Sequence, residues 1–146
     1  MVKIKVAWIG KTKSSAIQAL TDEYLKRLSH YAETEALALR DEAALLKLCA
    51  ARPAKHFLIL FDSAGKQLGS EEFAKFIADH QDRNPLPLLL AIGPANGFSD
   101  GARRAAAFIL SLGKMTLAHE LARVVVLEQT YRALTILKGH PYHLGH

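Results

Sequence analysis

The side chains best suited to chemistry lie in the last part of the chain, from Leu110 to Gly145. Histidine, arginine and tyrosine are interspersed there with apolar residues, at His119, Arg123, Tyr131, Arg132, His140, Tyr142 and His143. Core packing alone does not explain this composition, because histidine and arginine are seldom fully buried without a polar partner. The segment therefore predicts a polar binding or catalytic site.

Two arginines in this segment are candidates for binding an anion, because a guanidinium group contacts phosphate or carboxylate at two points. Glu128 precedes Arg132 by four residues, which is the favourable order for an ion pair on a helix. Arg132 is therefore either a structural residue or an anion-binding one. Arg123 has only Glu120 within reach, and we expect it at a substrate contact or at a dimer interface.

Strand and helix patterns alternate along the chain. Strands are expected over residues 2–9, 33–39, 57–61 and 88–92, of which the last is an unbroken apolar run typical of a central parallel strand. Helices are expected over residues 14–31, 43–51 and 119–138. A turn is expected at residues 62–65, and two further helices are expected to begin at Ser70, whose hydroxyl can cap the helix, and at Ser99. This order predicts an α/β fold, with a mainly parallel sheet and flanking helices, in a single domain over residues 1–146.

In a parallel sheet, ligands bind at the carboxyl ends of the strands, so we expect a site at the turns after Phe61, Ile92 and Leu110. The loop after Ile92 holds Gly93 and Gly97, which permit close approach of the backbone to a ligand but alone are better explained by an ordinary turn. The glycine spacing of a dinucleotide-binding loop and that of a Walker loop are both missing, which argues against NAD and ATP.

The composition favours a basic protein of the cytoplasm. The chain has a formal net charge of +5 and a pI near 9.4, which favours a polyanionic partner such as nucleic acid. Cys49 is the only cysteine, so no intramolecular disulfide can form and a reducing compartment is expected. No apolar run approaches the roughly 18 residues of a membrane helix, so a membrane is not expected as a partner. The histidines are scattered without the spacing of metal ligands, so a metal is not expected either.

Three groups of residues in the C-terminal part follow the signature of one family. They are Leu110, Ser111, Met115, Thr116 and His119; then Arg123, Val124, Leu127, Glu128, Gln129, Tyr131, Arg132 and Ala133; and then Tyr142 and His143. Together with Gly10–Lys11, Asp62 and Gly65–Lys66 this pattern resembles the RlmH-type enzymes, which are bacterial methyltransferases of the SPOUT class. The resemblance covers essentially the whole chain.

The resemblance implies an S-adenosylmethionine-dependent enzyme that methylates N3 of a pseudouridine in large-subunit (23S) ribosomal RNA, with the assembled ribosome as the expected partner. It also implies a homodimer and a trefoil knot in the C-terminal part of the sheet. The cofactor-binding residues carried over by position are Phe61, Gly93, Leu112, Gly113, Lys114, Met115, Thr116 and Leu117. Without the resemblance, Leu112, Met115 and Leu117 would be assigned to the core.

Methylation at N3 requires the imide nitrogen to lose its proton, so the enzyme must supply a proton acceptor and a setting that tolerates the anion. The resemblance implies that His143 acts as base or proton relay, that Tyr142 contacts the target base, and that Arg132 stabilises negative charge. The alternative for His143 is a loose residue of the tail. The apolar residues Leu121, Val124, Val125 and Leu134 of the last helix are expected to exceed what the sheet covers, which also favours a dimer.

The chain departs from the family pattern at three positions, where Pro94 replaces a glycine, Gly113 a serine and Leu144 a basic residue. Pro94 has no N–H group, so a cofactor bond from that amide cannot form. These departures leave a second hypothesis, a catalytically weakened RNA- or ribosome-binding module on the same fold. The enzyme is favoured, because a binding module would need neither the cofactor loop nor the Tyr142–His143 pair.

Overall fold

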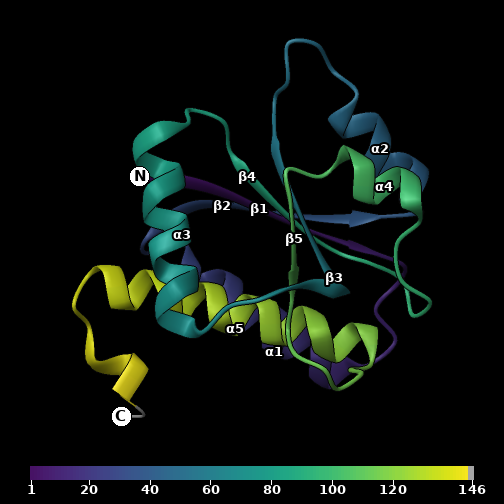
Figure 1. The fold of residues 1–146 in the computed structure, drawn as a ribbon. Helices are drawn as coiled ribbons and strands as arrows, with labels where there is room; N and C mark the ends of the chain where they lie inside the picture. Colours follow the sequence, from purple (N-terminus) through teal and green to yellow (C-terminus); the bar gives the residue numbers. More distant parts are fainter. Residues whose placement is uncertain (145–146) are drawn as a thin grey trace.

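Five parallel strands form one sheet in the order β2-β1-β4-β3-β5 in the computed structural model, which describes residues 1–144 (Figure 1). The strands are β1 (Val2–Ile9), β2 (Ala32–Leu39), β3 (Phe57–Gln67), β4 (Leu88–Ile92) and β5 (Phe108–Ser111). The helices are α1 (Ser15–Leu28), α2 (Glu42–Cys49), α3 (Ser70–Arg83), α4 (Asp100–Ala105), α5 (His119–Leu137) and the short 3-10 helix η1 (Pro141–Leu144). The predicted α/β fold is confirmed. Gly145 and His146, the latter expected as tail, lie outside the described residues.

Helices cover both faces of the sheet and create two cores. All five residues of β4 are buried, and successive side chains point to opposite faces. Leu88, Leu90 and Ile92 pack in the core covered by α1, α3 and α5. Leu89 and Ala91 pack in the smaller core covered by α2 and α4. This two-sided burial explains why the sequence of β4 is apolar without alternation.

The third strand is longer than the sequence predicts, because the expected turn at residues 62–65 is a bulge inside β3 (Phe57–Gln67). Phe61 and Lys66 both pair with Leu110 of β5, so the residues between them are extra. Asp62 Oδ1 accepts a hydrogen bond of 2.9 Å from the backbone N–H of Ala64, which closes the bulge. The strand then resumes pairing, and the prediction that it ends near Phe61 is wrong.

Two further expectations about the helices are corrected. The hydroxyl of Ser70 does not cap α3; the carboxylate of Glu72 accepts from the N–H of Gly69 at 2.8 Å, and Ser70 donates to Gln129 Oε1 at 2.7 Å. The helix expected over residues 14–31 ends earlier, at Leu28, and Leu20 on this helix is 44% exposed. Within residues 1–144 no helix combines the length and apolar character needed to cross a membrane.

Gly65 permits the close approach of the bulge to β5. A Cβ atom at this position would lie 2.5 Å from the carbonyl carbon of Leu110, which belongs to the backbone and cannot rotate away. We therefore expect Gly65→Ala to lower the free energy of unfolding by about 1–3 kcal/mol, the usual cost of overpacking. Urea unfolding followed by circular dichroism measures the change.

Gly101 of α4 provides the matched control, because its Cβ would meet its nearest neighbour, Ser99 Oγ, at an ordinary 3.5 Å. Gly101→Ala should leave stability unchanged or raise it by up to about 1 kcal/mol, since alanine favours a helix. Equal stability of the two variants would contradict the role assigned to Gly65.

Candidate functional site

A cavity of about 310 Å³ opens at the bulge of β3 and the carboxyl ends of β4 and β5. Parallel strands bring their carboxyl ends to one edge of the sheet, and each loop that follows contributes to the cavity wall. The cavity is lined by Phe61, Asp62, Ser63, Ile92, Gly93, Pro94, Ala95, Asn96, Gly97, Arg103, Ser111, Leu112, Gly113, Met115, Thr116, Leu117, His119 and Ala122. The three turns singled out in the sequence therefore meet around one space.

Seven of the eight residues assigned to cofactor binding line this cavity, and Lys114 does not. Met115 is 88% exposed and Leu117 36% exposed, so the alternative that both belong to the core is wrong. Leu112 is half-buried and packs against the larger core. The loop from Leu112 to Leu117 thus presents apolar side chains that have little packing of their own.

Two glycines shape the cavity. Gly113 has a φ of +132°, a conformation that L side chains rarely adopt, and the hydroxyl of Ser111 accepts from its N–H and donates to its carbonyl. A Cβ atom on Gly93 would lie 2.9–3.0 Å from three ring atoms of buried Phe98. The ring can therefore occupy its place beside the cavity only because residue 93 is glycine.

An ion pair forms the polar part of the cavity wall. Arg103 Nη2 donates to Asp62 Oδ2 at 3.0 Å, and the Asp62 side chain is only 3% exposed. Burial by itself would raise the pKa of Asp62, but the hydrogen bonds from Ala64 and Arg103 outweigh it and hold this pKa below its usual value. Asp62 is therefore a fixed negative charge at the end of β3.

A second carboxylate, that of Glu42, holds the end of the loop after β4. Glu42, the first residue of α2, accepts from the backbone N–H of Ser99 at 2.7 Å and also from the Ser99 hydroxyl. The Ser99 hydroxyl in turn caps α4, which begins where the sequence predicts a helix. The cavity wall between Gly93 and Ser99 is thus tied to α2.

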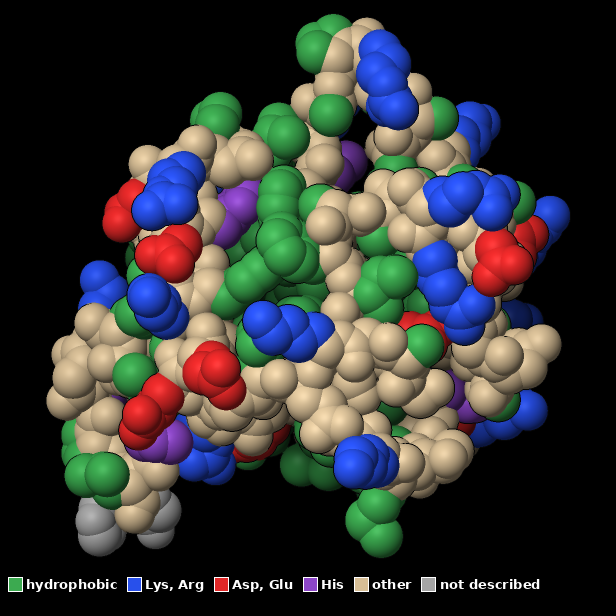
Figure 2. All heavy atoms as spheres, viewed as in Figure 1, with side chains coloured by type: hydrophobic (Ala, Val, Ile, Leu, Met, Phe, Trp, Pro, Cys, Tyr) green, Lys and Arg blue, Asp and Glu red, His purple; other side chains and the backbone are tan. Residues whose placement is uncertain are grey.

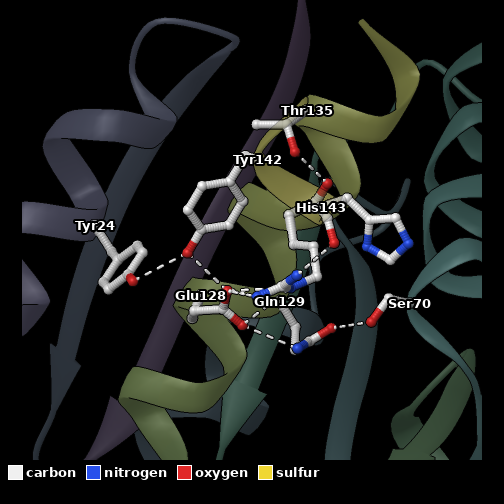
Figure 3. A network of polar contacts seen from close by, with 8 residues as sticks. Tyr24, Ser70, Glu128, Gln129, Thr135, Tyr142 and His143 are labelled. Carbon is white, nitrogen blue, oxygen red and sulfur yellow. Dashed lines mark hydrogen bonds and ion pairs between the residues drawn. The ribbon is translucent and has the colours of Figure 1, made fainter. Parts of the chain in front are cut away.

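A polar network centred on Glu128 forms on α5, near the chain end (Figure 3). Arg132 donates to Glu128 Oε2 from Nη2 at 2.8 Å and from Nε at 3.2 Å, so the predicted ion pair is confirmed. Tyr142 donates its hydroxyl to the same oxygen at 2.8 Å and lies 3.2 Å from the hydroxyl of Tyr24 on α1. The sequence analysis treated Glu128 only as a partner of Arg132, whereas the structure makes it the centre of the network.

The network fixes the ionisation of Tyr142 and the position of His143. Burial and the hydrogen bonds with Tyr24 and Glu128 raise the pKa of Tyr142 well above its usual value, so this hydroxyl remains a donor at neutral pH. Arg132 Nη1 donates to the carbonyl of His143 at 3.2 Å, and the His143 Nε2 atom lies 3.4 Å from Glu71 Oε1. His143 therefore belongs to a structured turn, η1, and not to a loose tail.

A second cavity of about 290 Å³ adjoins the strand-end cavity and extends to Gln129, a neighbour of Glu128, but Arg132, Tyr142 and His143 do not line it. It shares Phe61, Ser111, Leu112 and Gly113 with the first cavity and extends to Val125 and Gln129. Gln129 accepts from Ser70 and donates to Glu128 at 2.9 Å. Ala122, Val125, Gln129 and Arg132 follow at spacings of three and four residues, which places them on one face of α5.

Arg123 does not lie where the sequence analysis expected it. Its side chain is 1% exposed, donates to Thr12 Oγ1 at 2.7 Å and lies 4.2 Å above the ring of Trp8. Burial lowers its pKa from the usual value. Both expected roles, substrate contact and dimer interface, are wrong for this chain, because the guanidinium group is enclosed by β1 and the loop that follows it.

The apolar stripe proposed as a dimer interface is also partly wrong. Val124 and Leu134 are buried in their own chain, whereas Leu121 is 44% exposed.

No group of three or more His, Cys, Asp or Glu side chains in residues 1–144 is arranged to hold a metal ion.

Comparison with known proteins identifies relatives along the whole chain. A family model described as "Predicted SPOUT methyltransferase" matches residues 2–143. Proteins named ribosomal RNA large subunit methyltransferase H are 56% identical in Koribacter versatilis, over 99% of this chain and 100% of that one, and 41% identical in Geobacter sulfurreducens, over 97% and 99%.

Solved structures with the same fold share little sequence with this chain. The SpoU methyltransferase AviRb from Streptomyces viridochromogenes, crystallised with AdoMet, superposes with a TM-score of 0.56 at 15% identity, over 94% of this chain and 59% of that one. A probable methyltransferase from Bordetella pertussis superposes with a TM-score of 0.58 at 9% identity, over 91% and 95%. At such identities the likeness concerns the fold alone.

Proposed function

The chain belongs to the SPOUT methyltransferase family, and from that premise we propose that it transfers a methyl group from S-adenosylmethionine to N3 of a pseudouridine in 23S ribosomal RNA. The relatives at 56% and 41% identity are named for ribosomal RNA of the large subunit, and they align over nearly their full length. The observation that carries the proposal is the pair of adjoining cavities, one at the strand-end edge of the sheet and one that extends to Gln129 beside the Glu128 network.

The first cavity fits the proposed cofactor. Its apolar wall, formed by Leu112, Met115 and Leu117, suits a flat adenine ring, and Gly93 and Gly113 leave room for backbone contacts. Asp62 and Arg103 supply charge at another part of the wall, which suits a ligand with an amino-acid end. When bound, S-adenosylmethionine supplies a methyl group activated by its sulfonium charge.

The second cavity and the network suit the target base. N3 of a pseudouridine is an imide nitrogen between two carbonyl groups, so its deprotonation places negative charge on the ring. Arg132 carries a fixed positive charge that Glu128 orients, and Tyr142 offers a hydroxyl that stays protonated. Arg132 would stabilise the anion by its charge, which is the usual way that an active site favours a developing charge. The single hydroxyl proton of Tyr142 is donated to Glu128, so Tyr142 would contact the base through its ring.

His143 is the proposed proton acceptor. Its ring is 28% exposed and its Nε2 atom faces the carboxylate of Glu71, so an imidazolium formed on this ring would have a negative partner at once. Glu71 itself is 79% exposed and is therefore a weak partner. His143 would accept the imide proton, and Glu71 would hold the protonated ring in place.

We also propose that the active form is a homodimer that acts on the assembled ribosome in the cytoplasm. The exposed apolar residues Met115, Leu117 and Leu121 follow one another closely where the cavity loop enters α5, and their exposure supports a contact with a second copy. The basic composition supports binding to RNA. The trefoil knot implied by the family resemblance stays a prediction.

Met115 tests the cofactor cavity. Met115→Ala removes an apolar side chain from the cavity wall. This side chain has little packing within the protein, so the fold should be unaffected. S-adenosylhomocysteine should bind roughly 5- to 30-fold more weakly, because it loses an apolar contact. Lys114→Ala is the matched control, because Lys114 lies in the same loop but does not line the cavity. Titration calorimetry measures both. If both variants bind S-adenosylhomocysteine with equal affinity, its adenosine part does not lie against Met115.

His143 tests the chemistry. His143→Ala removes the proposed proton acceptor, so single-turnover methyl transfer to large ribosomal subunits lacking the modification should fall roughly 10²- to 10⁴-fold. His30→Ala, at an exposed site on the opposite end of α1 from the cavity loop, should transfer normally. Mass spectrometry of the released nucleosides also tests whether the product is N3-methylpseudouridine.

Near-normal transfer by His143→Ala would remove this residue from the mechanism. Ribosome binding by the wild-type protein without any methyl transfer would instead favour the second hypothesis, a weakened binding module.

Leu121 tests the assembly. Sedimentation at micromolar concentration should give twice the chain mass of 16.0 kDa, and Leu121→Glu should shift the protein towards a monomer. Leu20→Glu is the control, because Leu20 is equally exposed at 44% but lies on α1. A wild-type monomer at this concentration would contradict the dimer.

A further inference from the structure

Arg103 occupies an unusual place in the cavity wall, because it is shared between a buried carboxylate, that of Asp62, and an exposed one, that of Asp100. Its side chain is 35% exposed and lines the strand-end cavity. It projects from α4, the short helix that covers the smaller core, opposite the side covered by α5. In Figure 2 basic side chains gather over this region of the molecule.

Asp62 fixes the orientation of the guanidinium group. The Asp62 carboxylate is buried, accepts from Arg103 Nη2 at 3.0 Å, and receives further backbone hydrogen bonds from Ala64 and Phe98. A carboxylate held by several donors cannot rotate freely, so it sets the plane of the arginine fork that binds it. The bulge of β3 is thus joined to α4 through one side chain.

The second partner of Arg103 is much weaker. Nη1 donates to Asp100 Oδ1 at 3.1 Å, but the Asp100 side chain is 83% exposed. An exposed ion pair between neighbours on a helix contributes only about 0–1 kcal/mol, so a ligand that brings its own carboxylate can replace Asp100. Asp62 would remain in place and keep the fork aligned.

We infer that Arg103, oriented by Asp62, binds the carboxylate of the amino-acid end of the cofactor. This inference rests on the proposed function, which assigns the cavity to S-adenosylmethionine. The apolar wall from Leu112 to Leu117 takes the adenine side. Among the lining residues of the described part of the chain, Arg103 is the one arginine, and it lies in the polar part of the wall. An amino-acid carboxylate is the anionic group of this cofactor, and a guanidinium fork matches its two oxygens.

The test compares two ligands that differ only in that carboxylate. S-adenosylhomocysteine carries it, and its decarboxylated analogue keeps the amine and the adenosine part. By titration calorimetry, the wild-type protein should bind S-adenosylhomocysteine roughly 10- to 100-fold more tightly than the analogue, the range of a charge-assisted hydrogen bond. In Arg103→Gln this preference should disappear, through loss of affinity for S-adenosylhomocysteine alone.

Arg104→Gln is the matched control, because Arg104 is the next residue of α4, is exposed and does not line the cavity. It should keep the wild-type preference. Thermal unfolding of each variant reports whether loss of the ion pair with Asp62 disturbs the fold. Arg103→Lys keeps the charge but not the guanidinium fork, so it should recover only part of the preference for S-adenosylhomocysteine.

Two results would overturn the inference. One is a wild-type protein that binds both ligands equally, a measurement that requires no variant. The other is an Arg103→Gln protein that loses affinity for both ligands to the same extent, which would make Arg103 a support of the wall. If the wild-type protein binds neither ligand, the proposed cofactor itself is wrong and the inference falls with it.

Discussion

The central strand of the sheet imposes the constraint on which the rest of the structure depends. β4 has no exposed residue, so both faces of the sheet must be covered by helices, and its neighbours β1 and β3 must satisfy its backbone on both edges. Parallel pairing on both sides then brings the carboxyl ends of the strands to one edge. Loops that are far apart in the sequence meet there, and the space between them cannot be filled by the sheet itself. The strand-end cavity follows from this arrangement.

The Glu128 carboxylate plays a comparable part for the chain end. It is partly buried and accepts from Arg132, Tyr142 and Gln129, so the last turn of the chain is attached to α5 by charge as well as by packing. The rings of Tyr131 and Tyr142, 4.7 Å apart, and of Tyr24 close the network on the side of α1. A single carboxylate thereby determines where His143 lies.

The sequence predicted the parts of the fold that depend on local patterns. The apolar run of β4, the alternation of strands and helices and the start of a helix at Ser99 were all evident from periodicity and composition, and the family resemblance indicated which loops meet. The bulge after Phe61 was not predictable, because it depends on the pairing of Lys66 with Leu110, a contact between distant segments. Arg123 was misjudged for the same reason: its partners Thr12 and Trp8 are more than 100 residues away in the sequence. Arg103 carried no signal at all, since only the folded chain brings it to Asp62.

The periodicity of α5 explains how one sequence segment can serve both cavities. Ala122 lines the first cavity, Val125 and Gln129 line the second, and Arg132 belongs to the Glu128 network. The helix rises about 1.5 Å per residue, so these four positions span roughly 15 Å along one face. Because the helix is buried against the sheet and against α1 and α3, this spacing cannot change without disrupting the larger core. A substituted residue on this face would therefore alter one cavity while leaving the distance between the cavities intact. That rigidity is what a transfer between two separately bound partners requires, since a positional error of about 1 Å can reduce the rate by two orders of magnitude.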